Sequence, residues 1–303
     1  MAFTAKDVQA LREKTGCGMM DCKKALVECD GNMDAAADYL REKGLASQAK
    51  KAGRIAAEGT VAVYTADGVG AIVELNSETD FVANGDGFKA LANEVAQIVA
   101  DQNPADMDAL LACEKDGMTV EAKVQELFLA IRENIKVRRF ERFEGKVVSY
   151  VHAGGKIGVL VNFETELSGD NEGLIAMGKN VAMQIAAMNP AYLDQASVPA
   201  SVIEKEKEIL IAQMKEDPKM ANKPDAVLGK IVEGKIGKYY KENCLVEQAF
   251  VINGDINVGK YVADTAKELG ADVKIASFVR FEKGEGIEKR VDDFAAEVAA
   301  MAK

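Results

Sequence analysis

The sequence predicts an α+β protein with four parts: an N-terminal three-helix module, a duplicated core of two small antiparallel three-stranded sheets with helices, an inserted antiparallel helical hairpin and a C-terminal helix. Three features indicate this class. Short helical segments bounded by glycines open the chain, a strand–strand–helix unit occurs twice, and two long helical runs interrupt the second copy. A chain of 303 residues has room for these parts.

The N-terminal module is predicted to span residues 1–45, because helical apolar spacing recurs there between glycines. The expected helices run from Thr4 to Gly16, from Asp21 to Cys29 and from Asn32 to Gly44. Residues 46–57 begin with a polar, basic stretch, which predicts a solvated linker. A docking role for Lys50 and Lys51 on an acidic partner is the weaker alternative, because exposed charge pairs contribute little.

The duplicated unit defines the core. The first copy comprises strands Glu58–Tyr64 and Val69–Val73 and a helix ending at Asn103-Pro104; the second comprises Glu144–Tyr150, Ile157–Val161 and a helix ending at Asn189-Pro190. A further helix near 119–134 and two similar strands, Lys136–Glu144 and Lys274–Glu282, complete the pattern. The predicted subdomains are therefore 58–143 for the first half and 144–195 with 244–284 for the second.

The second half is interrupted by residues 196–243, which are predicted to form an antiparallel helical hairpin from the runs Val202–Glu216 and Val227–Asn243. The apolar positions expected to face each other are Ile203, Ile209, Leu210 and Met214 on one helix and Leu228, Ile231, Val232 and Ile236 on the other. Such an arm suits self-association or a coiled-coil contact with a partner, and an inert excursion that packs only on itself is an equal alternative.

Residues 285–303 are predicted to form a C-terminal helix that begins near Glu288 after a glycine break. Val291, Phe294 and Val298 lie on one face of this helix. That face suits packing on the same chain and packing on a partner equally.

Composition excludes several classes of function. A net charge of −11 argues against direct binding to nucleic acid, because contacts to phosphates need clustered Lys and Arg. The five cysteines show no close pair and suit a reducing compartment as small buried apolar residues, and with a single histidine a zinc site is not expected. Neither a signal sequence nor a membrane-spanning run is recognisable, so we expect a cytoplasmic protein that does not bind membranes.

The sequence offers no constellation of residues typical of an enzyme. The run Gly154–Gly158 lies between two predicted strands and not before a helix, so we interpret it as a hairpin turn rather than a phosphate loop. His152, beside this turn, is expected to be exposed and uninvolved in chemistry. Without a nucleophile and its base, we expect neither covalent catalysis nor a cofactor.

The stretch Thr79–Val82 is the strongest candidate for a binding site. Phe81 follows a predicted strand and is either a plug in the core or a probe for a partner's pocket. When the two halves are aligned on Gly70 and Gly158, Phe81 falls opposite Gly169. Because the same fold position tolerates glycine, the aromatic ring is an addition to the first half, which favours the probe.

Three stretches of this chain resemble the bacterial elongation factor Ts family: Leu11–Leu26, Thr79–Val82, and Arg280–Glu282 with Gly284–Gly286. The resemblance covers essentially the whole chain. It implies a guanine-nucleotide exchange factor for elongation factor Tu that acts by binding and not by covalent chemistry. It also implies that the N-terminal module resembles a ubiquitin-associated (UBA) fold, that the hairpin serves homodimerisation and that the C-terminal helix docks on the partner.

The same resemblance assigns contacts with the partner residue by residue. Thr79, Asp80, Phe81 and Val82 would disturb the partner's Mg²⁺ site. Contacts from the N-terminal module would come from Leu11, Arg12, Met19, Met20 and Lys23, and contacts from the second half of the core from His152, Val251 and Ile252. Two other classes stay open: a protein-binding scaffold without exchange activity, and an enzyme acting on a small molecule at an unrecognised site.

Overall fold

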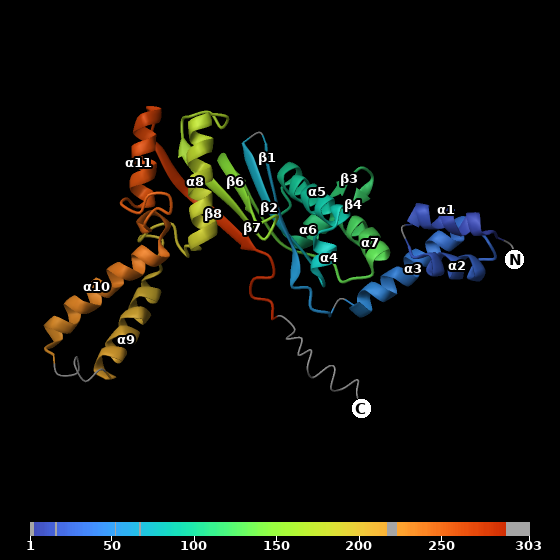
Figure 1. Cartoon of the computed structure of the whole chain (residues 1–303), viewed down its shortest axis with the longest axis horizontal. Helices are drawn as coiled ribbons and strands as arrows, with labels where there is room; N and C mark the ends of the chain where they lie inside the picture. The colour runs from blue at the N-terminus through green and yellow to red at the C-terminus, as the bar shows by residue number, and fades with distance from the viewer. Residues whose placement is uncertain (1–2, 16, 52, 67, 217–222, 289–303) are drawn as a thin grey trace.

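The computed structural model describes residues 3–15, 17–51, 53–66, 68–216 and 223–288. These residues form a mixed helix-and-sheet protein with small antiparallel sheets, in agreement with the predicted α+β class (Figure 1). Among them, no helix is long and apolar enough to cross a membrane. The predicted C-terminal helix lies outside the described residues from position 289 onward.

The N-terminal helices are α1 (Ala5–Thr15), α2 (Met19–Glu28) and α3 (Met33–Lys51). Their shared core contains Val8, Leu11, Cys17, Cys22, Ala25, Leu26, Ala36 and Leu40. Cys17, Cys22 and Cys244 are buried, as the sequence predicted, whereas Cys29 and Cys113 are only half-buried. Burial raises the pKa of the Cys22 thiol, which keeps this side chain protonated and apolar.

The predicted end of the third helix at Gly44 is wrong. Helix α3 continues to Lys51, so residues 46–51 of the expected linker are helical. Gly44 does not end the helix because its role is to allow close packing: a Cβ atom there would lie 1.9 Å from the Cδ2 atom of Leu129 on α7 (Val120–Ile131). A glycine inside a helix costs about 1 kcal/mol relative to alanine, and here it permits the module to approach the core.

The first half of the core is a sheet with the strand order β1-β2-β5, antiparallel throughout. Its elements are β1 (Glu58–Ala66), β2 (Val69–Ser77), α4 (Asp80–Ala83), α5 (Asp86–Gln102), α6 (Met107–Ala112), the short pair β3 (Glu114–Lys115) and β4 (Met118–Thr119), α7 and β5 (Lys136–Glu144). Helix α5 covers one face of this sheet, and Phe88, Val95 and Val99 are among its residues in the core. The returning strand Lys136–Glu144 is confirmed with its predicted bounds.

The second half repeats this arrangement with the strand order β6-β7-β8. Its elements are β6 (Lys146–His152), β7 (Ile157–Thr165), α8 (Glu172–Met188), the 3-10 turn η1 (Leu245–Glu247), α11 (Val258–Leu269) and β8 (Val273–Glu282). Figure 1 shows the two sheets between α8 on one side and α5 on the other. Each sheet is therefore covered by its own helix on one face and by the other sheet on the opposite face.

The contact between the sheets is nearly symmetric. Its core is formed by Val61, Ile72, Leu160 and Phe281. A Cβ atom on Gly70 of β2 would lie 2.3 Å from Val147 Cγ1, and one on Gly158 of β7 would lie 2.4 Å from Val61 Cγ1. Glycine at these matched positions lets each sheet approach the other, because any larger residue would overlap a valine of the opposite sheet.

The insertion forms helices α9 (Ala200–Glu216) and α10 (Asp225–Asn243), which project from the rest of the molecule (Figure 1). They share a small apolar cluster of Leu210, Met214, Val232 and Ile236, against which Ile203, Leu228, Ile231 and Tyr240 pack. The prediction that Ile209 faces the other helix is wrong, because its side chain is exposed. Ile209 is adjacent to Leu210, and neighbours on a helix point about 100° apart, so both cannot face α10 equally.

Candidate functional site

The turn that carries Phe81 is a short helix set on the end of β2. Helix α4 begins after Thr79, whose hydroxyl accepts a hydrogen bond from the Val82 N–H at 3.4 Å. Asp80 is exposed and Val82 packs partly on the first core. The side chain of Phe81 is 87% exposed, so the plug interpretation is excluded and the ring is presented to solvent.

Polar contacts hold this turn from the side of the core. The Ser77 hydroxyl donates to the Thr79 carbonyl at 3.0 Å. The Thr79 N–H and hydroxyl both donate to the carboxylate of Glu133, at 3.0 and 2.7 Å. The polar groups of the turn that face the core therefore have hydrogen-bond partners. These bonds favour one orientation of the turn and of the exposed ring that it carries.

The matching region of the second half is different. After β7 the chain passes through bends at Glu166 and Leu167 and a turn at Gly169 and Asp170, and none of the described residues between β7 and α8 is helical. Asn171 then caps α8 by accepting a hydrogen bond from the Leu174 N–H at 3.0 Å. Both halves thus make the same strand-to-helix corner, and only the first carries an exposed aromatic ring.

On the N-terminal module, Met19 and Met20 open helix α2 after Gly18, and both are exposed, Met20 to 74%. Arg12 and Lys23 are exposed as well. The prediction that Leu11 contacts a partner is wrong. Leu11 has no exposed surface because it lies in the core of the three helices, where it supports α1 instead.

In the second half, His152 ends β6 and is exposed, as predicted, with its Nδ1 atom 3.0 Å from the Tyr150 hydroxyl. Val251 and Ile252 lie in the loop between η1 and α11 and are exposed. The Val251 N–H donates to the buried Gln184 side chain at 2.8 Å, which anchors the loop on α8. Two apolar side chains are thereby held on the surface by a polar contact beneath them.

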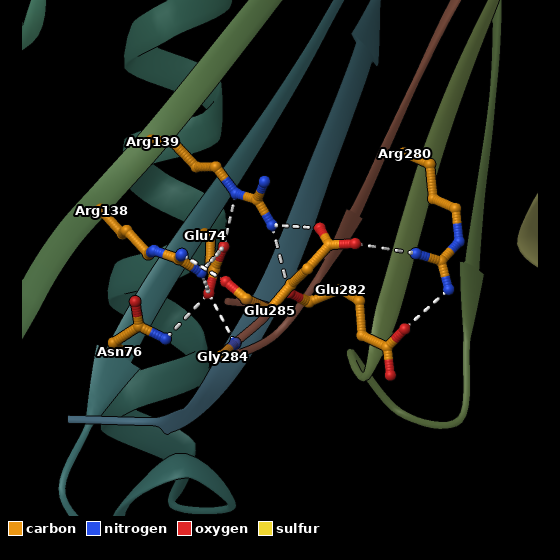
Figure 2. A network of polar contacts seen from close by, with 8 residues as sticks. All are labelled: Glu74, Asn76, Arg138, Arg139, Arg280, Glu282, Gly284 and Glu285. Atoms are coloured by element: carbon orange, nitrogen blue, oxygen red, sulfur yellow. Dashed lines mark hydrogen bonds and ion pairs between the residues drawn. The ribbon is translucent and has the colours of Figure 1, made fainter. Parts of the chain in front are cut away.

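Sequence reasoning missed a buried carboxylate, Glu74 on β2 (Figure 2). Its hydrogen-bond donors are the Gly284 N–H at 2.7 Å, Asn76 at 3.0 Å, Arg138 at 2.9 Å and Arg139 at 2.6 Å. Burial alone would raise the pKa of Glu74, but these donors outweigh burial and hold the pKa below its ordinary value. The ionised carboxylate joins β2 and β5 to the segment that follows β8.

One signal for this network was present in the sequence, since Glu74 is the only charged residue of β2. Asn76 lies on the same strand, but the other partners could not be inferred from spacing, because they come from β5 and from the segment after β8. In the described part of the chain, no group of three or more His, Cys, Asp or Glu side chains could hold a metal ion.

Comparison with known proteins identifies the class. A family model described as elongation factor TS matches residues 78–285, which places the chain among the elongation factors of protein biosynthesis. The chain is 50% identical over 308 residues to an elongation factor Ts of Syntrophotalea carbinolica, with 100% of both chains covered. It is 49% identical over 305 residues to elongation factor Ts of Clostridium perfringens, with 99% of each covered, and 47% identical to that of Clostridium botulinum, with 98% of this chain and 97% of the relative covered. The chain belongs to the elongation factor Ts family.

Proposed function

We propose that this protein binds elongation factor Tu in its GDP-bound form and promotes release of GDP and its exchange for GTP. It does so by disturbing the Mg²⁺ and phosphate site of the partner, with Asp80 and Phe81 as the inserted groups and Thr79 and Val82 as the residues that shape their turn. The observation that carries this proposal is the exposure of Phe81 on a turn whose inner side is held by Glu133.

An exchange factor of this kind needs no catalytic side chain. A protein that binds the nucleotide-free partner more tightly than the nucleotide-bound partner weakens nucleotide binding by the same factor. Displacing the elements that hold Mg²⁺ leaves the diphosphate charge less compensated, because the ion is among the largest charges in such a site. A 1000-fold weakening corresponds to about 4 kcal/mol, at about 1.4 kcal/mol per factor of ten.

Two further surfaces extend the contact. On the N-terminal module, exposed Met19 and Met20 supply apolar area, with Arg12 and Lys23 beside them in the sequence as charged groups. On the second half of the core, His152, Val251 and Ile252 contact another domain of the partner. All seven of these side chains are exposed, which supports their use as a surface.

The proposed function also assigns roles to the N-terminal module, the helical hairpin and the predicted C-terminal helix. The N-terminal module has a UBA-like fold. The predicted C-terminal helix lies outside the described residues, and its proposed role is to dock on the partner. Helices α9 and α10 form the dimerisation hairpin, a role supported by the exposure of Ile209, Ile211 and Val227 along them. An analytical ultracentrifugation run on the free protein tests homodimerisation directly.

The decisive experiment measures release of a fluorescent GDP analogue from elongation factor Tu by wild-type protein and by Phe81→Ala. We expect the substitution to slow stimulated release by at least about 30-fold, the effect of losing a buried aromatic contact of about 2 kcal/mol. Because Phe81 is exposed in the free protein, its unfolding free energy should change by no more than about 0.5 kcal/mol.

Met188→Ala is the matched control for loss of an exposed apolar side chain, since Met188 is exposed but ends α8 in the second half of the core, whereas Phe81 lies in the first half. It should leave the stimulated rate unchanged. Equal rates for wild type and Phe81→Ala would exclude the role of Phe81.

The alternative function is a protein-binding scaffold without exchange activity, and the exposed Met19–Met20 pair on a separate module favours it as the second candidate. A scaffold would retain its partner in a pull-down experiment without accelerating nucleotide release. Release of the retained partner by added GDP supports the exchange factor and excludes the scaffold.

A further inference from the structure

Residues 132–134, between α7 and β5, contact both the N-terminal module and the turn that carries Phe81. Arg132 follows the last residue of α7 with a positive φ of 66°, and its N–H donates to the Phe128 carbonyl. This left-handed residue ends the helix and turns the chain toward β2. In Figure 1, α7 lies between α4 and the three N-terminal helices.

Arg132 provides the contact with the N-terminal module. Its guanidinium group lies 3.1 Å from the carboxylate of Asp21 on α2, and both side chains are partly exposed. Its carbonyl accepts a hydrogen bond from the ammonium group of Lys51 at the end of α3. One residue is thus linked to two of the three N-terminal helices.

Glu133 and Asn134 provide the contacts with the Phe81 turn and its approach. Both carboxylate oxygens of Glu133 accept hydrogen bonds from Thr79. The Asn134 N–H donates to the Glu78 carboxylate at 2.7 Å, and its side-chain amide donates to the Arg54 carbonyl at 2.8 Å. The end of β2 and the segment after α3 are therefore fixed to the same short stretch.

Through these contacts, residues 132–134 link the exposed methionines of α2 to the turn that carries Phe81. Asp21 directly follows Met20, and Thr79 lies two residues before Phe81. The Cα atoms of residues 132 and 134 are separated by at most about 7.6 Å, because consecutive Cα atoms lie about 3.8 Å apart. Close packing of Gly44 on Leu129 adds an apolar contact between the module and α7.

We propose that Arg132, Glu133 and Asn134 act as a bracket that sets the position of Met19 and Met20 relative to Phe81, so that both engage one protein partner at the same time. These three are positioning residues for exchange, since they act through the exposed side chains and do not need to touch the partner. The proposal rests on the proposed function and adds a requirement to it. Two attachments held at a fixed separation gain from each other, because the first raises the effective concentration of the second.

The test titrates each variant against elongation factor Tu loaded with fluorescent GDP and extracts the maximal release rate and the half-saturating concentration. Glu133→Ala removes the acceptor of both Thr79 donors, so the turn loses its orientation. We expect the maximal rate to fall about tenfold because the turn is no longer held in one orientation, and the thermal unfolding midpoint of the free protein to fall by about 5 °C because two hydrogen bonds to a charged group are lost.

Glu133→Gln is the conservative variant that should rescue this loss. Its amide oxygen can accept from the Thr79 N–H while its amide nitrogen donates to the Thr79 hydroxyl, which has lone pairs to spare. We expect a maximal rate within about twofold of wild type. Glu126→Ala, an exposed position on the preceding helix α7 with the same change of charge, is the matched control and should behave as wild type.

A double-mutant cycle separates positioning from a general structural role. If Glu133 acts through Phe81, Glu133→Ala should have little further effect in the Phe81→Ala background. A full additional loss in that background, or a wild-type rate for Glu133→Ala, overturns the proposal. If Glu133→Ala fails to fold, the exchange of charges Asp21→Arg with Arg132→Asp tests the other end of the bracket, because aspartate tolerates the left-handed conformation.

Each single charge reversal should raise the half-saturating concentration, and the double variant should restore the wild-type value. Equal half-saturating concentrations for the two single variants and the double variant would overturn the bracket. Failure of the wild-type protein to accelerate release would overturn the proposed function together with the bracket. Normal acceleration by wild type with no effect of any bracket variant would overturn the bracket alone.

Discussion

The two halves of the core share their packing and differ in their polar and exposed residues. Both sheets have a register shift at the same aligned point of the middle strand, between Glu74 and Leu75 in one and between Asn162 and Phe163 in the other. The long helix of each half ends at an asparagine in the left-handed conformation, Asn103 with φ 48° and Asn189 with φ 46°. Backbone geometry has been retained in both copies.

The difference at the register shift is chemical. Glu74 is a buried carboxylate with two arginines, whereas Asn162 at the matched position donates to the Glu144 carbonyl and leaves its own side-chain oxygen without a hydrogen-bond partner among the described residues. The exposed corner differs as well, with Phe81 in one half and Gly169 in the other. Positions that the halves share therefore serve the fold, and positions where they differ carry the connection through Glu74 and the exposed Phe81, which is the proposed binding group.

The largest expected effect on stability comes from replacing Glu74, the residue at the register shift of the first half. Glu74→Ala leaves Arg138 and Arg139 facing each other without their shared carboxylate and frees the segment at Gly284. We expect a loss of about 3 kcal/mol in unfolding free energy, the lower end of the range for breaking a buried ion pair, because the arginines are partly exposed. Asn162→Ala, the matched variant in the second half, should cost no more than about 1 kcal/mol. Urea unfolding of both variants measures the difference, and equal losses would contradict the assignment of different roles.

A smaller effect tests the shared packing between the sheets. Gly70→Ala and Gly158→Ala each place a methyl group against a valine of the opposite sheet, and each should cost about 2 kcal/mol by overpacking. Because the two contacts are nearly equivalent, the two losses should agree within about 1 kcal/mol. Adding Val147→Ala should relieve Gly70→Ala and leave Gly158→Ala unrelieved. Thermal unfolding of the wild type, the two single variants and the two double variants with Val147→Ala decides whether the two contacts are equivalent.

The smallest expected effect is the pH dependence that Glu74 adds to the first half. The pKa of Glu74 in the folded protein is held below its ordinary value of 4.5, so ionised Glu74 contributes stability above about pH 4.5. This contribution is lost as the pH falls below that value and passes through the folded-state pKa. Glu74→Gln should remove this part of the acid sensitivity, whereas Asn162→Ala should retain it. Acid titrations followed by circular dichroism distinguish the two, and identical acid midpoints for wild type and Glu74→Gln would contradict the assignment.

Much of the architecture was predictable because it depends on local pattern. Alternating apolar residues and turn formers located the strands, and the repetition of whole segments identified two similar halves, including the returning strands at 136–144 and 274–282. The candidate site was predictable to the same degree, since the motif around Phe81 and the Met19–Met20 pair could be found by resemblance. Leu11 was misassigned because a motif does not distinguish a residue that supports a surface from one that forms it.

By itself, the sequence determined the α+β class, the duplication and the family, because periodicity, turn chemistry and motifs are properties of neighbouring residues. Only the tertiary structure decided that Phe81 is exposed, that α3 continues through Gly44, and that Glu74 holds the segment after β8. The physical reason is distance along the chain. Glu74 meets partners 64, 65 and 210 residues away, and Thr79 meets Glu133 54 residues away, so the burial and the charge pairing of these groups exist only after distant parts of the chain have packed together.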